Sequence, residues 1–153
     1  MKIEYLADHP SFIPTLSRWF MEASPDYYSG KTLEDVAATF EPRLNRGRVP
    51  LALVALEDEE PLGTVSLLEE SVTTHTHLTP WLAGLHVAEA RRHQGIATKL
   101  IEALVQEAAA INFETLYIGI SRAEDFYSAR GWQTVDKIVY YDKPLTIMQL
   151  RLD

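Results

Sequence analysis

The stretch Ala90–Leu100, ARRHQGIATKL, joins a predicted strand to a predicted helix. The strand is residues 81–88, WLAGLHVA, and the helix is residues 95–111, whose apolar side chains recur at helical spacing. A helix N-terminus carries unpaired backbone N–H groups and a partial positive charge. A basic turn with one glycine at such a place predicts a binding site for a phosphate or a similar anion.

The remaining segments predict an α/β domain built on a mixed sheet. Alternating or continuous apolar runs predict strands, and apolar residues three and four positions apart predict helices. The further strands expected are residues 2–7, 49–58, 62–70, 114–121, 134–142 and 145–152, and the further helices are 11–23, 33–46 and 122–132. The strand–helix–strand unit around the basic turn should be right-handed with parallel strands, whereas the other pairings should be antiparallel.

Capping residues, glycines and a proline mark the expected ends of several helices and strands. Thr32 and Asp35 have the spacing of a capping box at the start of the second helix, which Gly47 should close. Pro42 should kink that helix or begin a separate turn, because proline lacks a backbone N–H. Gly131 should end the short helix that follows residue 122, and a turn is expected at residues 142–144.

Length and composition favour one domain over residues 1–153. The chain has no cysteine, which excludes disulfides, thiolate metal sites and a cysteine nucleophile. A formal net charge of −8 disfavours nucleic acid and anionic membranes as partners and favours a cationic one, such as an amine. The N-terminus lacks the apolar region of a signal peptide, and no apolar run could span a bilayer, so a cytoplasmic location is expected.

Two segments resemble the GNAT superfamily of acyl-CoA-dependent N-acetyltransferases. Residues 92–97, RHQGIA, match its turn (Gln/Arg)-x-x-Gly-x-(Gly/Ala), whereas no GxxxxGK[ST] or GxGxxG motif is present. Residues 123–132, AEDFYSARGW, match A-x-x-(Phe/Leu)-Tyr-x-x-x-Gly-(Phe/Trp). The resemblance covers residues 80–132. It implies a mixed, mostly antiparallel sheet of about seven strands, flanked by about four helices, with a central βαβ unit that binds acyl-CoA.

The resemblance also implies an activity and its residues. The protein would transfer the acetyl group of acetyl-CoA to a primary amine of a small molecule or peptide by direct attack on the thioester. Tyr127 would protonate the departing thiolate of coenzyme A, and the backbone N–H of Val87 would stabilise the oxyanion. The cofactor-binding residues would be Leu85, His86 and Val87 for pantetheine, Arg92, His93, Gln94, Gly95, Ile96, Ala97 and Thr98 for pyrophosphate, and Tyr127 for the sulfur.

The general base is open, because two positions depart from the family pattern. Trp81 stands where some members carry a glutamate, and Ile120 stands where many carry an asparagine. The remaining candidates are a water molecule or one of five side chains: Glu69, Glu70, His75, His77 and His86. No metal is expected, because His75 and His77 have no evident third ligand.

Other interpretations of these residues remain open. Arg91 and Arg92 could be solvated charges at a helix start, Tyr127 could be a core tyrosine, and His86 lies opposite Leu85 and Val87 as a structural histidine would. A catalytically silent acyl-CoA sensor or interaction module is the alternative function. A nucleotide-binding domain lacks its glycine-rich motifs. The sequence leaves a homodimer open.

Overall fold

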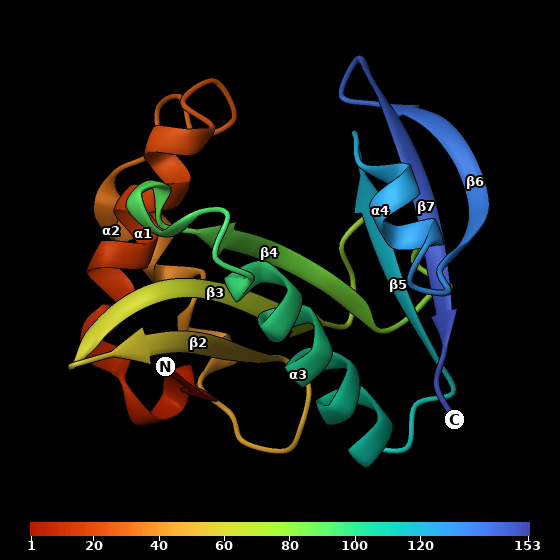
Figure 1. Cartoon of the computed structure of the whole chain (residues 1–153). Coiled ribbons are helices and arrows are strands. Elements are labelled where there is room, and N and C mark those ends of the chain that lie inside the picture. The colour runs from red at the N-terminus through yellow and green to blue at the C-terminus, as the bar shows by residue number, and fades with distance from the viewer.

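One seven-stranded sheet runs through this computed structural model, which describes residues 1–153 (Figure 1). Its strands lie in the order β1-β2-β3-β4-β5-β7-β6, and only β4 and β5 are parallel. The bounds are β1 Lys2–Tyr5, β2 Leu51–Glu57, β3 Glu60–Leu68, β4 Trp81–Val87, β5 Thr115–Ile120, β6 Gln133–Tyr140 and β7 Lys143–Arg151. The prediction of a mixed, mostly antiparallel sheet is confirmed.

Four α-helices cover the two faces of the sheet. They are α1 Ile13–Ala23, α2 Leu33–Ala38, α3 Ile96–Ala110 and α4 Glu124–Ser128, with short 3-10 turns η1 Leu6–Asp8, η2 Pro10–Phe12, η3 Glu41–Arg43 and η4 Glu89–Arg91. Helix α3 crosses in front of β2 to β4 in Figure 1. Helices α1 and α2 pack on the opposite face. The helices include none with the length and apolarity to cross a membrane.

The position of β2 between two cores explains why its sequence is a continuous apolar run. Alternate side chains enter two separate cores, so both faces of the strand are buried. Leu51, Leu53 and Ala55 pack on the α3 side, and Ala52, Val54 and Leu56 pack on the α1 and α2 side. The α3 face of the sheet is completed by the buried stripe Ile96, Leu100, Ile101, Leu104 and Ala108, which the helical spacing predicted.

Two boundaries differ from the sequence prediction. The predicted capping box is present, with Asp35 N–H donating to Thr32 Oγ1 at 3.1 Å and Thr32 N–H donating to Asp35 Oδ2 at 3.0 Å. However, α2 ends at Ala38, so Gly47 does not close it. Pro42 lies in the separate turn η3, which confirms the second alternative for this residue, because proline cannot continue the helical hydrogen bonds. The last hairpin turns one residue earlier than expected, at Tyr141–Asp142, where both residues have positive φ.

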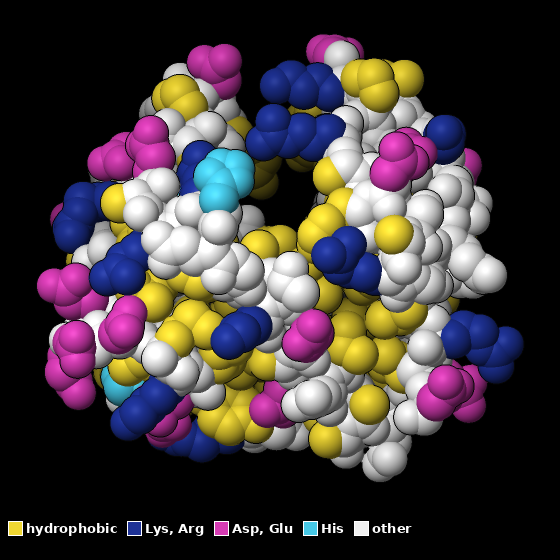
Figure 2. Space-filling model, viewed as in Figure 1, with side chains coloured by type: hydrophobic (Ala, Val, Ile, Leu, Met, Phe, Trp, Pro, Cys, Tyr) yellow, Lys and Arg dark blue, Asp and Glu magenta, His cyan; other side chains and the backbone are white.

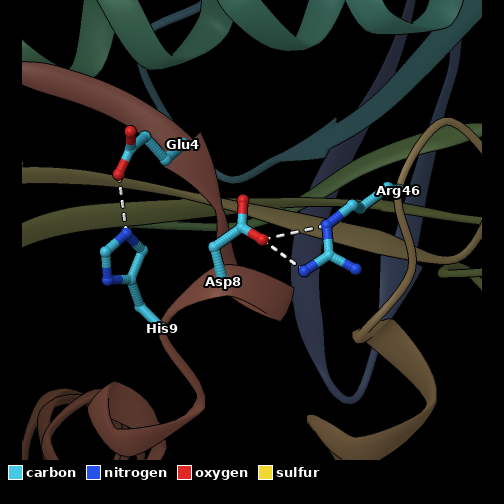
Figure 3. Close-up of polar contacts among 4 residues, drawn as sticks. All are labelled: Glu4, Asp8, His9 and Arg46. Carbon is cyan, nitrogen blue, oxygen red and sulfur yellow. Dashed lines mark hydrogen bonds and ion pairs between the residues drawn. The ribbon is translucent and has the colours of Figure 1, made fainter.

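The loop after η3 is anchored to the start of the chain (Figure 3). Arg46 Nε donates to Asp8 Oδ1 at 2.9 Å, and His9 Nε2 lies 2.6 Å from Glu4 Oε1. The side-chain amide of Asn45 donates to the carbonyl groups of residues 42 and 50, at 2.9 and 2.7 Å. The Arg46 and Asn45 contacts attach the loop that follows η3 to η1 and to the chain on either side of it.

Candidate active site

Strands β4 and β5 separate soon after they begin. Their parallel pairing is limited to Trp81 with Tyr117 and Leu82 with Ile118, and beyond these pairs the two strands diverge (Figure 1). The space-filling view has an open cleft between the two halves of the molecule, with Lys and Arg side chains at its rim (Figure 2). The sheet therefore offers unpaired strand edges to a ligand at its centre.

A β-bulge reshapes β4 at this opening. Ser66 pairs with Ala83 and Thr64 pairs with His86, so two residues of β4, Gly84 and Leu85, face a single residue of β3. Gly84 has φ +60, a conformation that glycine adopts without strain. After the bulge, Leu85 and Val87 pack toward α3, and His86 lies on the opposite face, as predicted.

The backbone of Val87 faces the cleft. Val87 pairs with Gly63 of β3, yet the neighbouring Ala88 N–H donates to Leu62 O at 2.9 Å. In an antiparallel ladder this pattern makes Val87 a non-hydrogen-bonded position, whose N–H and C=O point away from β3. The carbonyl of Val87 accepts a hydrogen bond from Arg92 Nε at 3.2 Å. The N–H of Val87 remains directed toward the gap between β4 and β5.

The basic turn carries consecutive backbone N–H groups that make no hydrogen bond within the protein. None of the N–H groups from His93 to Thr98 donates to a backbone or side-chain acceptor. His93 and Gly95 have φ values of +66 and +80, which curl the chain before α3 begins at Ile96. No atom lies within 4 Å of the place where a side chain on Gly95 would begin. Successive free N–H groups at a helix N-terminus fit an anion such as a pyrophosphate.

The flanking arginines differ in their surroundings. Arg92 is held by the carbonyl of Val87, so it links the turn to the end of β4. Arg91 Nη1 lies 3.4 Å from Glu57 Oε2, in an exposed ion pair of small energetic value. Of the two, Arg92 is the one positioned at the cleft.

Tyr127 is a buried ring with an accessible hydroxyl. Its side chain is 7 % exposed and packs edge-on against Phe126 and Trp132, in the same apolar cluster as Leu85 and Val87. The hydroxyl makes no hydrogen bond within the protein, and no side-chain polar atom of the chain is both buried and unpaired, so the hydroxyl oxygen reaches solvent. Burial raises the pKa of Tyr127, although the charge of Arg130 opposes this. The hydroxyl is therefore protonated at neutral pH.

His86 lies between two aromatic rings of α1. Its ring centroid is 5.6 Å from those of Trp19 and Phe20. Desolvation lowers the pKa of His86, the nearby charge of Arg92 lowers it further, and Glu22 opposes the shift. The imidazole is therefore neutral at pH 7, in the state that can accept a proton.

The other predicted base candidates lie in different settings. Glu69 and Glu70 are exposed beyond the end of β3. His75 Nε2 lies 2.9 Å from Asp136 Oδ2, and its ring stacks on that of His77 at 5.8 Å, so the loop of residues 69–80 is attached to β6. Trp81, at the position of the family glutamate, is fully buried and donates to Leu78 O at 2.7 Å. Of the five candidates, only His86 lies on β4, one of the two strands that border the cleft.

Arg43 is a candidate that the sequence did not reveal. Its guanidinium is half-buried beneath the β4 bulge, where Nη1 donates to Ser66 Oγ at 3.1 Å and Cζ lies 4.8 Å from the Phe40 ring centroid. The residues that surround it come from separate segments, and no motif links them. Only the fold brings them to one place.

Solved structures resemble the fold over the whole chain. They include an aminoglycoside 6'-N-acetyltransferase complexed with coenzyme A, which is 20 % identical with a TM-score of 0.77 over 100 % of this chain and 98 % of that one. A ribosomal-protein-alanine N-acetyltransferase from Brucella melitensis is 19 % identical with a TM-score of 0.79, covering 99 % and 100 % of the two chains. The yncA protein from Salmonella typhimurium, with its cofactor acetyl-CoA, is 18 % identical with a TM-score of 0.78, covering 100 % and 94 %. These similarities establish the fold.

A search of curated proteins found no match to this sequence. A family model, by contrast, covers both motifs, the bulged strand and the two helices on the opposite face. The model of the Acetyltransferase (GNAT) family matches residues 13–132, and the chain therefore belongs to this family of acetyltransferases.

Proposed function

We propose that this protein is an acetyl-CoA-dependent N-acetyltransferase that acts on a primary amine. The observation that carries the proposal is the cleft between β4 and β5. The free N–H groups of residues 93–98 lie at the start of α3, which follows the end of β4. The N–H of Val87 points into the cleft, and the hydroxyl of Tyr127 is accessible in the same apolar cluster. These are the parts that an acyl transfer needs.

Acetyl-CoA would supply a thioester that an amine can attack, and the chain fits it in two places. The free N–H groups of residues 93–98 would hold its pyrophosphate, with Gly95 allowing a close approach. The open edge of β4 would pair with the pantetheine arm through the main chain of Leu85 and Val87. Two of the similar structures are complexes with coenzyme A or acetyl-CoA, which supports this choice of donor.

Three groups of the chain would then assist the transfer. The amine nitrogen forms a bond to the acetyl carbon, the carbon–sulfur bond breaks, the amine loses a proton and the thiolate gains one. The N–H of Val87 donates to the acetyl oxygen as negative charge develops there. The protonated hydroxyl of Tyr127 suits it to give a proton to the sulfur. The neutral imidazole of His86 suits it to accept the proton from the amine, directly or through water.

Binding and turnover test the proposal separately. Because a ligand that binds only the native state stabilises it, millimolar acetyl-CoA should raise the melting temperature, whereas ATP and NAD should not. Coenzyme A release can be followed with a thiol reagent, since the chain has no cysteine to react. Acetyl-CoA that leaves the melting temperature unchanged would overturn the proposal. Stabilisation without release across a broad panel of amines would instead favour the silent sensor.

A further inference from the structure

Arg43 carries a positive charge that no acid of the chain balances. It belongs to none of the five ion pairs of the structure. Its only side-chain hydrogen bond is from Nη1 to Ser66 Oγ. No buried side-chain nitrogen of the chain lacks a partner, so Nε and Nη2 of Arg43 reach solvent. A half-buried guanidinium thus presents free donors to solvent.

The position of this guanidinium is closely defined. A Cβ on Gly84 would lie 3.8 Å from Arg43 Nη1, 3.8 Å from Ser66 Oγ and 3.7 Å from Phe20 Cζ. The charge therefore lies directly against Gly84 in the bulge of β4. Gly84 precedes His86 by two residues in the chain. The Phe40 ring under Cζ limits the motion of the side chain. Arg43 therefore lies against the β4 bulge that precedes Val87, on the sheet face opposite α3.

The surroundings make an anionic partner favourable. Burial lowers the pKa of Arg43, so the charged form is held at a desolvation cost, and only Tyr28, once ionised, would oppose that shift. Arginine remains protonated in proteins, so the charge persists without a counter-ion. A planar guanidinium with adjacent free N–H groups matches a carboxylate, which it can bind through two parallel hydrogen bonds.

Aromatic side chains complete this face. The rings of Trp19 and Phe20 each pack against His86, and Phe20 stacks on Phe40 at 5.8 Å. Burial raises the pKa of Tyr28, so its hydroxyl is neutral at pH 7 and adds no negative charge beside Arg43. The face combines one cation with apolar surface, which suits an acceptor that has both a carboxylate and an apolar side chain.

Resting on the proposed acetyltransferase function, we propose that the acceptor is an amino acid, whose carboxylate binds Arg43 while its amine faces the β4 bulge. This assignment runs against the net charge of −8, which favours a cationic acceptor. The local charge outweighs the net charge, because exposed acids beyond about 10 Å are screened by salt, whereas a half-buried cation in contact with the ligand is not.

Matched substrates test the assignment with the wild-type protein. Phenylalanine, phenylalaninamide and phenethylamine share one side chain, and methionine with methioninamide forms a second pair. Coenzyme A release gives kcat/KM, corrected for the fraction of unprotonated amine. Because hydrogen bonds to a charged group contribute about 1.5–3 kcal/mol, we expect the free amino acids to exceed their amides by about 10- to 100-fold. Equal rates with the amides would overturn the assignment while leaving the acetyltransferase function intact.

Variants test whether Arg43 is the group that reads the carboxylate. Arg43→Gln should raise KM for phenylalanine by about 10- to 100-fold and leave phenylalaninamide unchanged. Arg43→Lys should recover part of the loss, because it keeps the charge but not the planar fork. The control Arg151→Gln removes an exposed arginine at the end of β7, away from this face, and should behave as wild type.

Comparing phenylalanine with phenylalaninamide distinguishes recognition of the carboxylate from a general effect of Arg43 on activity. An equal loss with the acid and the amide would mean that Arg43 acts on acetyl-CoA or on the fold, and would overturn the assignment. Should Arg43→Gln fail to fold, Ser66→Ala removes only the oxygen that orients Nη1, and it should raise KM for the acid more than for the amide. Failure of acetyl-CoA to bind or to be consumed with any amine would overturn the proposed function itself.

Discussion

The turn at residues 92–98 and the face around Arg43 are two proposed binding regions built in opposite ways. The turn is contiguous in sequence, and its donors are backbone N–H groups that any residue but proline would supply. The face around Arg43 gathers side chains from α1, η3, β3 and β4. A region made of backbone keeps one ligand through many substitutions, whereas a region made of side chains can change its ligand by changing a few residues.

This difference predicts that substitutions in the two regions change different properties of the protein. Substitutions at the turn should reduce acetyl-CoA binding and spare the choice of acceptor. Substitutions on the opposite face should alter the choice of acceptor and spare acetyl-CoA binding. Tyr127 lies where the two ligands would meet, so a change there should affect the reaction more than either binding step.

Tyr127→Phe should have the largest effect. The substitution removes one oxygen and keeps the ring that packs on Trp132, so folding and acetyl-CoA binding should be preserved. General acids typically contribute about 10²–10⁴-fold, and kcat should fall by that range. Tyr117→Phe, another packed ring outside the cleft, is the control. An unchanged kcat would remove Tyr127 from the reaction, and lost acetyl-CoA binding would make it a cofactor contact instead.

Gly95→Glu should weaken acetyl-CoA binding by about 100-fold or more, because it places a negative charge where the pyrophosphate would lie. A left-handed glutamate also costs about 1–2 kcal/mol of stability. Gly47→Glu is a matched control, since Gly47 also has positive φ with open space around it but lies beside the C-terminal half of α3. Calorimetric titration with acetyl-CoA measures the difference. Equal affinities of the two variants would place the phosphate site elsewhere.

Gly63→Ala should destabilise the fold, because this glycine lies where the end of β4 and helix α3 approach β3 closely. A Cβ there would be 2.9 Å from His86 O and 3.1 Å from Leu100 Cδ1 of α3. Such overpacking typically costs about 1–3 kcal/mol of the free energy of unfolding, which urea denaturation measures. Gly119→Ala is the comparison, since its Cβ would meet only the side chains of Val72 and Leu145 at 3.3 Å or more. A Gly63 variant as stable as the Gly119 variant would contradict the close approach.

His86 should contribute the smallest effect, a pH dependence of stability. Its pKa in the folded protein is below the usual 6.5, because burial and Arg92 disfavour the charged form. The unfolded chain therefore binds the proton more readily, and stability should be lost as the pH falls from above 6.5 through the lower, folded pKa. Urea unfolding at pH 7.5 and 5.5 should reveal a smaller loss for His86→Gln than for the wild type. A larger loss would reverse the inferred sign of the shift.

Much of the fold and half of the site were predictable from local sequence. The apolar spacing of residues 96–108 predicted α3, and Gly131 and the capping box of Thr32 marked helix ends correctly. The second helix was predicted too long, because Gly47 was expected to end it, although the separate turn expected at Pro42 is present, where the missing N–H prevents a continuous helix. The hairpin turn was misplaced by one residue, because its positive φ values fall on Tyr141 and Asp142 and not on glycine or asparagine.

The sequence by itself determined the turn at residues 92–98 and the place of Tyr127, since each depends on a strand, a turn or a helix within one short segment. Only the tertiary structure decided that Arg43, Ser66 and Phe20 meet at Gly84. The bulge that creates this meeting depends on the register of β3 against β4. Register and burial arise from contacts between distant residues, and the exposure, charge and partners of a side chain follow from them. For this reason the sequence predicted where a phosphate would bind, and the fold alone located the cation that we propose binds the acceptor.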